Sequence, residues 1–125
     1  MPGDLPVIAI VDDDIAARRA VARLLASRQY HAKQFASAEQ YWTSAESSDA
    51  VCVLIDIDLG EGISGLELAR AIKATQNAPP IIFMSGSANP AVRVQAFEIG
   101  CIAYLEKPCL TEELLAAIHK AHAGA

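Results

Sequence analysis

Three short runs of apolar residues, rich in valine and isoleucine, lie at positions 7–11, 51–55 and 81–84 of the chain. None of them alternates polar with apolar side chains, as a strand with one face in water would. The pattern therefore predicts parallel strands that are covered on both faces. Residues 31–35 alternate polar with less polar side chains and suit an edge strand, and residues 102–105 supply a fifth strand.

Signals for helix starts lie between the predicted strands. Ser37 and Ser64 are each followed three positions later by Gln or Glu, which is the pattern of a capping box. Asn89 stands before a proline, a residue that the first turn of a helix tolerates. Asp14 is a further candidate cap, and Glu112 and Glu113 after Thr111 place negative charge at the positive end of the last helix. Strand and helix thus alternate five times, which predicts one doubly wound α/β sheet with right-handed crossovers, for which the strand order 2-1-3-4-5 is common.

Polar residues follow within two positions of the end of four of the five predicted strands. Asp12 and Asp13 follow the first strand, Asp56 the third, Ser85 the fourth and Lys107 the fifth. In sheets of this kind, ligands bind outside the carboxyl ends of the strands, near the point where the strand order reverses. Each residue alone could be a helix cap or a turn residue. Their joint placement indicates a shared site.

Three carboxylates that converge need a compensating cation. Two unit charges about 4 Å apart repel each other by roughly 4 kcal/mol at an effective dielectric constant of about 20. The candidate ligands are all oxygen atoms, without His or Cys, and this favours a hard ion such as Mg²⁺ over zinc or copper. Because Mg²⁺ commonly binds carboxylates together with phosphate oxygens, the sequence indicates a site that handles a phosphoryl group.

Composition limits the remaining classes of protein. A chain of 125 residues is long enough for one domain, and a net charge of −5 without a basic cluster argues against direct binding of nucleic acid. The apolar runs are too short to cross a bilayer and the first residues do not resemble a signal peptide, so we expect a cytoplasmic location and no membrane partner. We interpret Tyr41 and Trp42, on the predicted second helix, as packing residues.

The short motifs "VDDD", "LIDIDL", "SGLEL", "FMSGSA" and "YLEKP" resemble the receiver domain of bacterial two-component response regulators. The resemblance covers residues 6–121. It implies a flavodoxin-like, CheY-like (βα)5 fold, with a five-stranded parallel sheet in the order 2-1-3-4-5 and helices on both faces. It further implies a single receiver domain over residues 1–125, with residues 1–5 as a lead-in and residues 122–125 as a tail.

The resemblance also implies roles for individual residues. It makes Asp56 the phosphoacceptor, in a reaction that requires Mg²⁺, for which Mn²⁺ can substitute. Asp13 would bind the metal directly, and Asp12 directly or through a water molecule. Asp56 itself and the backbone carbonyl of Asp58 would complete the protein ligands. Lys107 would pair with one phosphoryl oxygen of the modified aspartate.

A conformational switch and its partners are implied as well. Ser85 would bind another phosphoryl oxygen, and as it turns toward the phosphoryl group Tyr104 can rotate inward, which changes the surface of the fourth helix, fifth strand and fifth helix. The implied partners are a sensor histidine kinase or phosphotransfer protein, an output domain or downstream protein, and a second copy of the chain bound through that surface. Such a domain signals, and catalyses at most its own phosphorylation and dephosphorylation.

One departure from the family pattern and two other classes of function leave alternatives open. The loop from Asp56 to Gly65, which contains "LGEGIS", is one residue longer than is usual, so Asp58 could be the acceptor in a shifted register. The chain could instead be an interaction module that works unphosphorylated. A flavodoxin-like cofactor binder or a small phosphatase is the third alternative, and the lack of a glycine-rich phosphate loop after the first strand argues against it.

Overall fold

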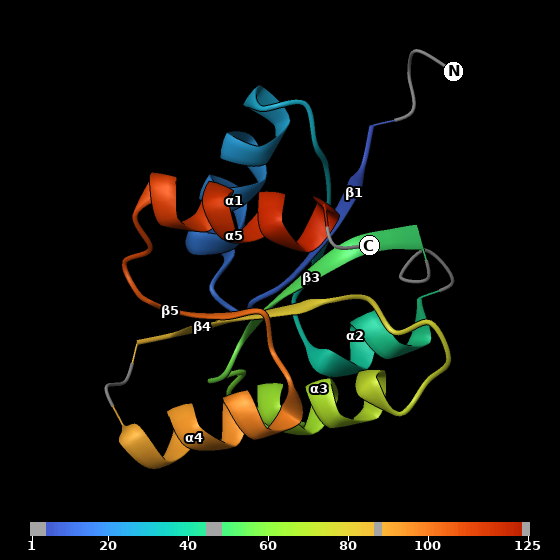
Figure 1. Ribbon diagram of the computed structural model, residues 1–125, viewed down its shortest axis with the longest axis vertical. Coiled ribbons are helices and arrows are strands. Elements are labelled where there is room, and N and C mark those ends of the chain that lie inside the picture. Colours follow the sequence, from blue (N-terminus) through green and yellow to red (C-terminus); the bar gives the residue numbers. More distant parts are fainter. Residues whose placement is uncertain (1–4, 45–48, 87–88, 124–125) are drawn as a thin grey trace.

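The computed structural model of the 125-residue chain describes residues 5–44, 49–86 and 89–123. Strands and helices alternate throughout this part of the chain (Figure 1). The strands are β1 (Val7–Val11), β2 (His31–Phe35), β3 (Ala50–Asp56), β4 (Ile81–Ser85) and β5 (Ala103–Glu106). The helices are α1 (Ile15–Ser27), α2 (Ala38–Thr43), α3 (Gly65–Lys73), α4 (Pro90–Ile99) and α5 (Thr111–Ala123).

The strands form one parallel sheet in the order β2-β1-β3-β4-β5, which confirms the predicted fold class. The order reverses at β1, which pairs with both β2 and β3. Val11, the last residue of β1, lies opposite Phe35 on one side and Ile55 on the other, and Ser85 at the end of β4 lies opposite Glu106. The residues that follow β1, β3, β4 and β5 therefore emerge at the same edge of the sheet.

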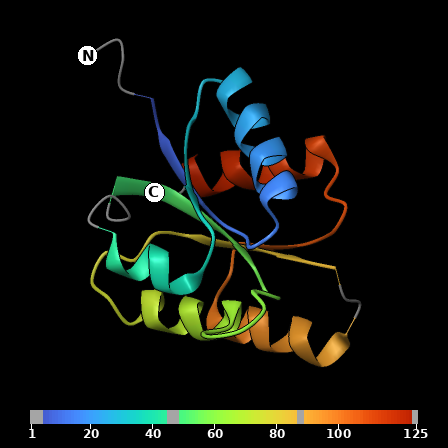
Figure 2. The ribbon, with the colours of Figure 1, turned by 180° about the vertical axis from the view of Figure 1, so that it is seen from behind.

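Helices cover both faces of this sheet, as Figures 1 and 2 show. α1 and α5 lie on one face, and α2, α3 and α4 lie on the other. Successive residues of β1 and β3 enter different cores: Ala9, Val11, Val53 and Ile55 pack on the α2 side, and Ile8, Ile10, Cys52 and Leu54 on the α1 side. Because both faces are buried, the strands read as continuous apolar runs.

The predicted helix starts are confirmed, with one difference in detail. At α3 the capping box is complete, since the Ser64 hydroxyl accepts a hydrogen bond from the Glu67 amide and the Glu67 carboxylate accepts one from the Ser64 amide, both at 3.1 Å. At α2 the Ser37 hydroxyl accepts from the Gln40 amide at 3.1 Å, as expected. The Gln40 side chain, however, accepts from the amide of Ala36 at 2.9 Å, one residue before the cap. In the capping box of α2, the bond from the Gln40 side chain therefore goes to the residue before the cap and not to the cap itself.

The end of α5 differs from the predicted boundary of the tail. The helix continues to Ala123, two residues into the segment assigned to the tail, and Ala121 in its last turn is fully buried. The rest of the predicted lead-in and tail, residues 1–4 and 124–125, lies outside the described residues. Within the described part of the chain, no helix has the length and apolar character that a membrane crossing requires.

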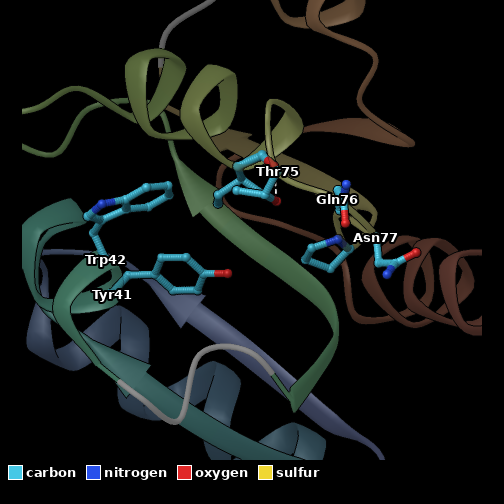
Figure 3. Close-up of a pocket in the computed structure, with 7 residues that line it drawn as sticks. Tyr41, Trp42, Thr75, Gln76 and Asn77 are labelled. Carbon is cyan, nitrogen blue, oxygen red and sulfur yellow. Dashed lines mark hydrogen bonds between the residues drawn. The ribbon is translucent and has the colours of Figure 1, made fainter.

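The packing role predicted for two aromatic residues of α2 holds for only one of them. Tyr41 is buried and contacts the Phe35 ring edge-on, with the ring centroids 5.4 Å apart. Trp42 is 51 % exposed and borders an open hollow of about 370 Å³, which the residues before β4, among them Thr75 and Asn77, also line (Figure 3). Neighbouring residues of a helix point in different directions, so Tyr41 and Trp42 cannot both face the core.

Candidate functional site

Three acidic side chains that the sequence predicts to converge do so at the carboxyl edge of the sheet. Asp12 and Asp13 follow β1, and Asp56 ends β3. Each offers one carboxylate oxygen to a group in which all three oxygens lie within 4.8 Å of one another. Asp12 and Asp56 are buried, at 1 % and 5 % exposed, while Asp13 is exposed. The group is therefore an acidic cluster that opens to solvent on the side of Asp13.

Lys107 reaches this cluster from the residue after β5. Its Nζ donates to Asp56 Oδ2 at 2.7 Å and to Asp12 Oδ2 at 3.1 Å. The Lys107 amide donates to the Ser85 carbonyl oxygen at 2.8 Å, which extends the β4 and β5 pairing by one residue, and the Lys107–Pro108 peptide bond is cis. One ammonium group thus bridges two buried carboxylates from the first and third strands.

The two adjacent acids after β1 differ in their contacts. Asp12 is bonded through its backbone and through both carboxylate oxygens. Its amide donates to the Phe35 carbonyl oxygen at 3.1 Å, its Oδ1 accepts from the Asp14 amide at 2.9 Å, and its Oδ2 accepts from Lys107. The Asp14 carboxylate caps α1, as predicted. The Asp13 carboxylate accepts no hydrogen bond from any residue that the structure describes. Asp13 is therefore the acid most available to an incoming cation.

The geometry around Asp56 bears on the alternative acceptor Asp58. The Asp58 amide donates to Asp56 Oδ1 at 2.9 Å, and Lys107 contacts the other oxygen, so the Asp56 carboxylate is fixed in rotation. Asp58 itself is exposed, and its carboxylate is not part of the acidic cluster. Asp56 therefore lies inside the acidic cluster, and the Asp58 carboxylate lies outside it.

The charges of the site are unbalanced toward the negative side. Burial raises the pKa of Asp56 above its usual value, although the hydrogen bonds from Lys107 and from the Asp58 amide act against this. Burial lowers the pKa of Lys107, but the hydrogen bonds to Asp56 and Asp12 and the negative charges of these two residues together outweigh that effect and raise the pKa above its usual value. Three carboxylates against one ammonium leave an excess of two negative charges when all are ionised. An oxygen-only donor set with this charge fits a divalent hard cation such as Mg²⁺.

The predicted switch residues lie on the neighbouring strands. Ser85, the last residue of β4, is 1 % exposed, and its neighbour Met84 pairs with Asp56 across the sheet. Tyr104, on β5, is buried, and within the described part of the chain its hydroxyl has no hydrogen-bond partner. The Arg93 guanidinium of α4 lies 5.3 Å from the centre of the Tyr104 ring. Tyr104 is thus turned inward and covered by a cation.

Two glycines let the loop between β3 and α3 lie close to acidic side chains. Gly60 has a φ of 71°, and a Cβ there would lie 3.1 Å from Asp13 Oδ2. Gly62 has a φ of 93°, and a Cβ there would lie 2.7 Å from Glu39 Oε2. The Ile63 amide donates to the same Glu39 oxygen at 3.1 Å and ties the loop to α2. Sequence reasoning missed Glu39, because no motif marks a contact across 24 positions.

A third glycine brings α3 against the end of β3. The Gly65 amide donates to the Ile57 carbonyl oxygen at 3.2 Å. A Cβ at Gly65 would overlap the Asp56 carbonyl oxygen and lie 2.8 Å from Ile57 Cα. Glycine is therefore required at this position if the backbone of Asp56 is to keep its place.

Comparisons with known proteins agree with this geometry. The family model of the response regulator receiver domain matches residues 8–119. The response regulator protein TodT of Pseudomonas putida is 35 % identical over 115 residues, which are 92 % of this chain and 50 % of TodT. The transcriptional regulatory protein FixJ of Azorhizobium caulinodans is 34 % identical over 118 residues, which are 94 % of this chain and 55 % of FixJ. The chain thus spans about half the length of these curated relatives.

A solved structure supports the same assignment. The response regulator receiver protein from Pseudoalteromonas atlantica superposes with a TM-score of 0.87 at 28 % identity, over 95 % of this chain and 98 % of that protein. The family model, the curated relatives and the fold all lead to one classification. The chain belongs to the response regulator receiver domain family.

Proposed function

We propose that Asp56 accepts a phosphoryl group from the phosphohistidine of a sensor histidine kinase or phosphotransfer protein, in a reaction that depends on Mg²⁺. The observation that carries this proposal is the contact of Asp56 Oδ2 with Lys107 Nζ at 2.7 Å, inside a cluster where Asp12 and Asp13 place oxygens within 4.8 Å. Phosphoryl transfer depends mainly on positioning and on neutralised charge, and this cluster offers both. The transfer from this donor would take place in the cytoplasm.

The chemistry follows from the residues around Asp56. One carboxylate oxygen forms a bond to phosphorus while the phosphorus–nitrogen bond of the donor breaks, and the imidazole leaves with the electron pair. Lys107 and Ser85 then bind oxygens of the aspartyl phosphate. Asp12, Asp13, Asp56 and the Asp58 carbonyl would hold the Mg²⁺ or Mn²⁺ ion. The bound ion would neutralise charge on the phosphoryl oxygens.

The phosphorylated state would be read at the surface formed by α4, β5 and α5. Ser85 and Tyr104 would couple this surface to the phosphoryl group, in keeping with their positions at the end of β4 and on β5. FixJ, which this chain matches over 55 % of its length, is named as a transcriptional regulatory protein. We propose a comparable output domain or downstream protein as the receiver of the signal, with a homodimer through the same surface as a second form.

The direct test is phosphorylation by a small donor. Incubation with acetyl phosphate and MgCl₂ should raise the intact mass by one phosphoryl group, and chelation of the metal should prevent this. Reduction with borohydride, followed by peptide mapping, should locate the acyl phosphate at Asp56. Asp56→Asn should abolish labelling, whereas the matched variant Asp58→Asn should keep it. Labelling that survives Asp56→Asn and disappears in Asp58→Asn would move the acceptor to the other residue.

The alternative is an interaction module that works unphosphorylated. Such a module would require neither a bound cation nor an ionised Asp56, so neither labelling nor Mg²⁺ binding is expected of it. The bridging of Asp12 and Asp56 by Lys107 supports the phosphoacceptor instead, since this arrangement assembles costly buried charge that a passive module does not need. Absence of Mg²⁺ binding at millimolar concentration would favour the passive module.

A further inference from the structure

Arg18, one turn into α1, makes a contact with the acidic cluster that the family motifs do not include. Its Nη1 donates a hydrogen bond of 2.8 Å to the backbone carbonyl oxygen of Asp12, in partly buried surroundings. This carbonyl belongs to the peptide group that joins Asp12 to Asp13. Arg18 is therefore bonded to the backbone at the point from which two acidic side chains of the cluster originate.

The bond completes the contacts of Asp12. The amide of Asp12 is bonded to Phe35 of β2, and its carboxylate oxygens are bonded to the Asp14 amide and to Lys107. Its carbonyl oxygen is bonded to Arg18. The Asp13 carboxylate, by contrast, accepts no hydrogen bond from any described residue. The direction of the Asp13 side chain therefore depends on the backbone that carries it.

We propose that Arg18 is a positioning residue for the divalent cation, which it does not touch: it fixes the peptide between Asp12 and Asp13 and so aims the Asp13 carboxylate. The inference rests on the proposed function, because it concerns the ion that Asp13 would bind. The Arg18 Nε is buried, and within the described part of the chain it has no hydrogen-bond partner. The bond from Nη1 to the Asp12 carbonyl oxygen is thus the hydrogen bond by which the described residues hold this guanidinium group.

A purely electrostatic role of Arg18 would have the opposite sign. A guanidinium group repels a divalent cation, so its removal would strengthen Mg²⁺ binding through Coulomb forces alone. Loss of positioning would weaken binding, because a ligand that is no longer held in direction must be ordered when the ion arrives. The direction of the change in Mg²⁺ affinity therefore separates the two roles.

The experiment compares three variants of the metal-free protein by calorimetric titration with MgCl₂. Arg18→Met keeps the apolar stem and removes the donor, and Arg18→Lys keeps a donor long enough to reach the carbonyl. Arg19→Met changes the net charge equally at the exposed neighbouring position. We expect Arg18→Met to raise the Kd for Mg²⁺ by about tenfold. Arg18→Lys should restore most of the affinity, and Arg19→Met should leave it unchanged or slightly tighter.

Thermal unfolding in EDTA and in MgCl₂ provides the second measurement. Positioning predicts that Arg18→Met reduces the increase in Tm that Mg²⁺ produces in the wild-type protein. A lower Tm in EDTA with unchanged Mg²⁺ affinity would overturn the inference and leave a structural role only. Tighter Mg²⁺ binding would also overturn it and would indicate an electrostatic role. If Arg18→Met does not fold, Arg18→Gln, whose side chain is too short to reach the carbonyl, carries the same expectation. A wild-type protein that binds no Mg²⁺ would instead refute the proposed function.

Discussion

The substitution Asp56→Asn tests whether the acidic cluster is strained when no cation is bound. Asp12 and Asp13 each place an oxygen within 4.8 Å of Asp56, so each pair repels by about 3.5 kcal/mol at an effective dielectric constant of about 20. On the same scale Lys107, at 2.7 Å, attracts Asp56 by about 6 kcal/mol. Lys107 and Asp13 are partly in water, which reduces both values. The attraction of Asp56 by Lys107 and its repulsion by Asp12 and Asp13 thus nearly cancel. The cost of burying the charged carboxylate then remains, and it makes a neutral side chain at position 56 more stable.

We therefore expect Asp56→Asn to stabilise the metal-free protein at pH 7 by about 1 kcal/mol, which corresponds to roughly 3–5 °C in Tm for a domain of this size. The pH dependence follows from the raised pKa of Asp56. The folded state holds this proton more tightly than the unfolded state, so the stability that the proton contributes is present at low pH and is lost as pH rises through the folded pKa. Because Asn does not titrate, the advantage of the variant should shrink as the pH falls through that value.

Thermal unfolding in EDTA between pH 7 and pH 4, repeated in MgCl₂, measures these differences. Binding of Mg²⁺ to the wild-type protein should reduce or reverse the advantage of the variant. Asp49→Asn is the matched control, because it changes the net charge equally at a side chain that is 71 % exposed, and it should change Tm little. A variant that is less stable than the wild type in EDTA at pH 7, or an advantage independent of pH, would refute the reasoning.

Three further substitutions probe other parts of the site. Lys107→Met should abolish phosphorylation and lower the stability of the metal-free protein by about 1–3 kcal/mol, since two buried carboxylates lose their cation; unchanged labelling with acetyl phosphate would contradict this. Gly65→Ala should lower stability by about 1–3 kcal/mol and slow phosphorylation, because the added Cβ displaces the Asp56 backbone; Tm and labelling rate equal to wild type would be inconsistent with the packing described. Arg93→Ala should remove about 0.5–1 kcal/mol of stability by uncovering the rings of Tyr104 and Phe97, an effect that Arg93→Lys should partly restore; a Tm shift of the same size in both variants would argue against stacking.

The fold was predictable because its signals are local. The apolar runs lack alternation where the strands are covered on both faces, and the cap residues Asp14, Ser64 and Asn89 mark helix starts within the same few positions. The boundaries moved by one residue at several strand ends. β3 begins one residue earlier than the predicted 51–55 and ends one residue later, at the buried Asp56, β4 extends to Ser85, and β5 is shifted forward by one residue.

The candidate site was predictable at the level of residue type and strand end, but its contacts were not. The sequence placed Asp12, Asp56 and Lys107 at one edge of the sheet, and the structure adds that Lys107 bridges both acids across 95 and 51 positions. The contacts of Arg18 and Glu39 depend on side-chain directions set by the packing of α1 and α2. No pattern of apolar and polar positions encodes such directions.

Trp42 is the only tryptophan of the chain, and it borders the hollow beside the residues that precede β4, at the opposite edge of the sheet from the acidic cluster. Its emission therefore reports the surroundings of α2 and is not quenched by direct contact with an ion. A change in fluorescence on addition of metal or phosphodonor would therefore report a structural change that reaches α2, and the contact of Glu39 with the loop before α3 offers a route for it. Trp42 would then serve as an optical probe of coupling between the acidic cluster and α2.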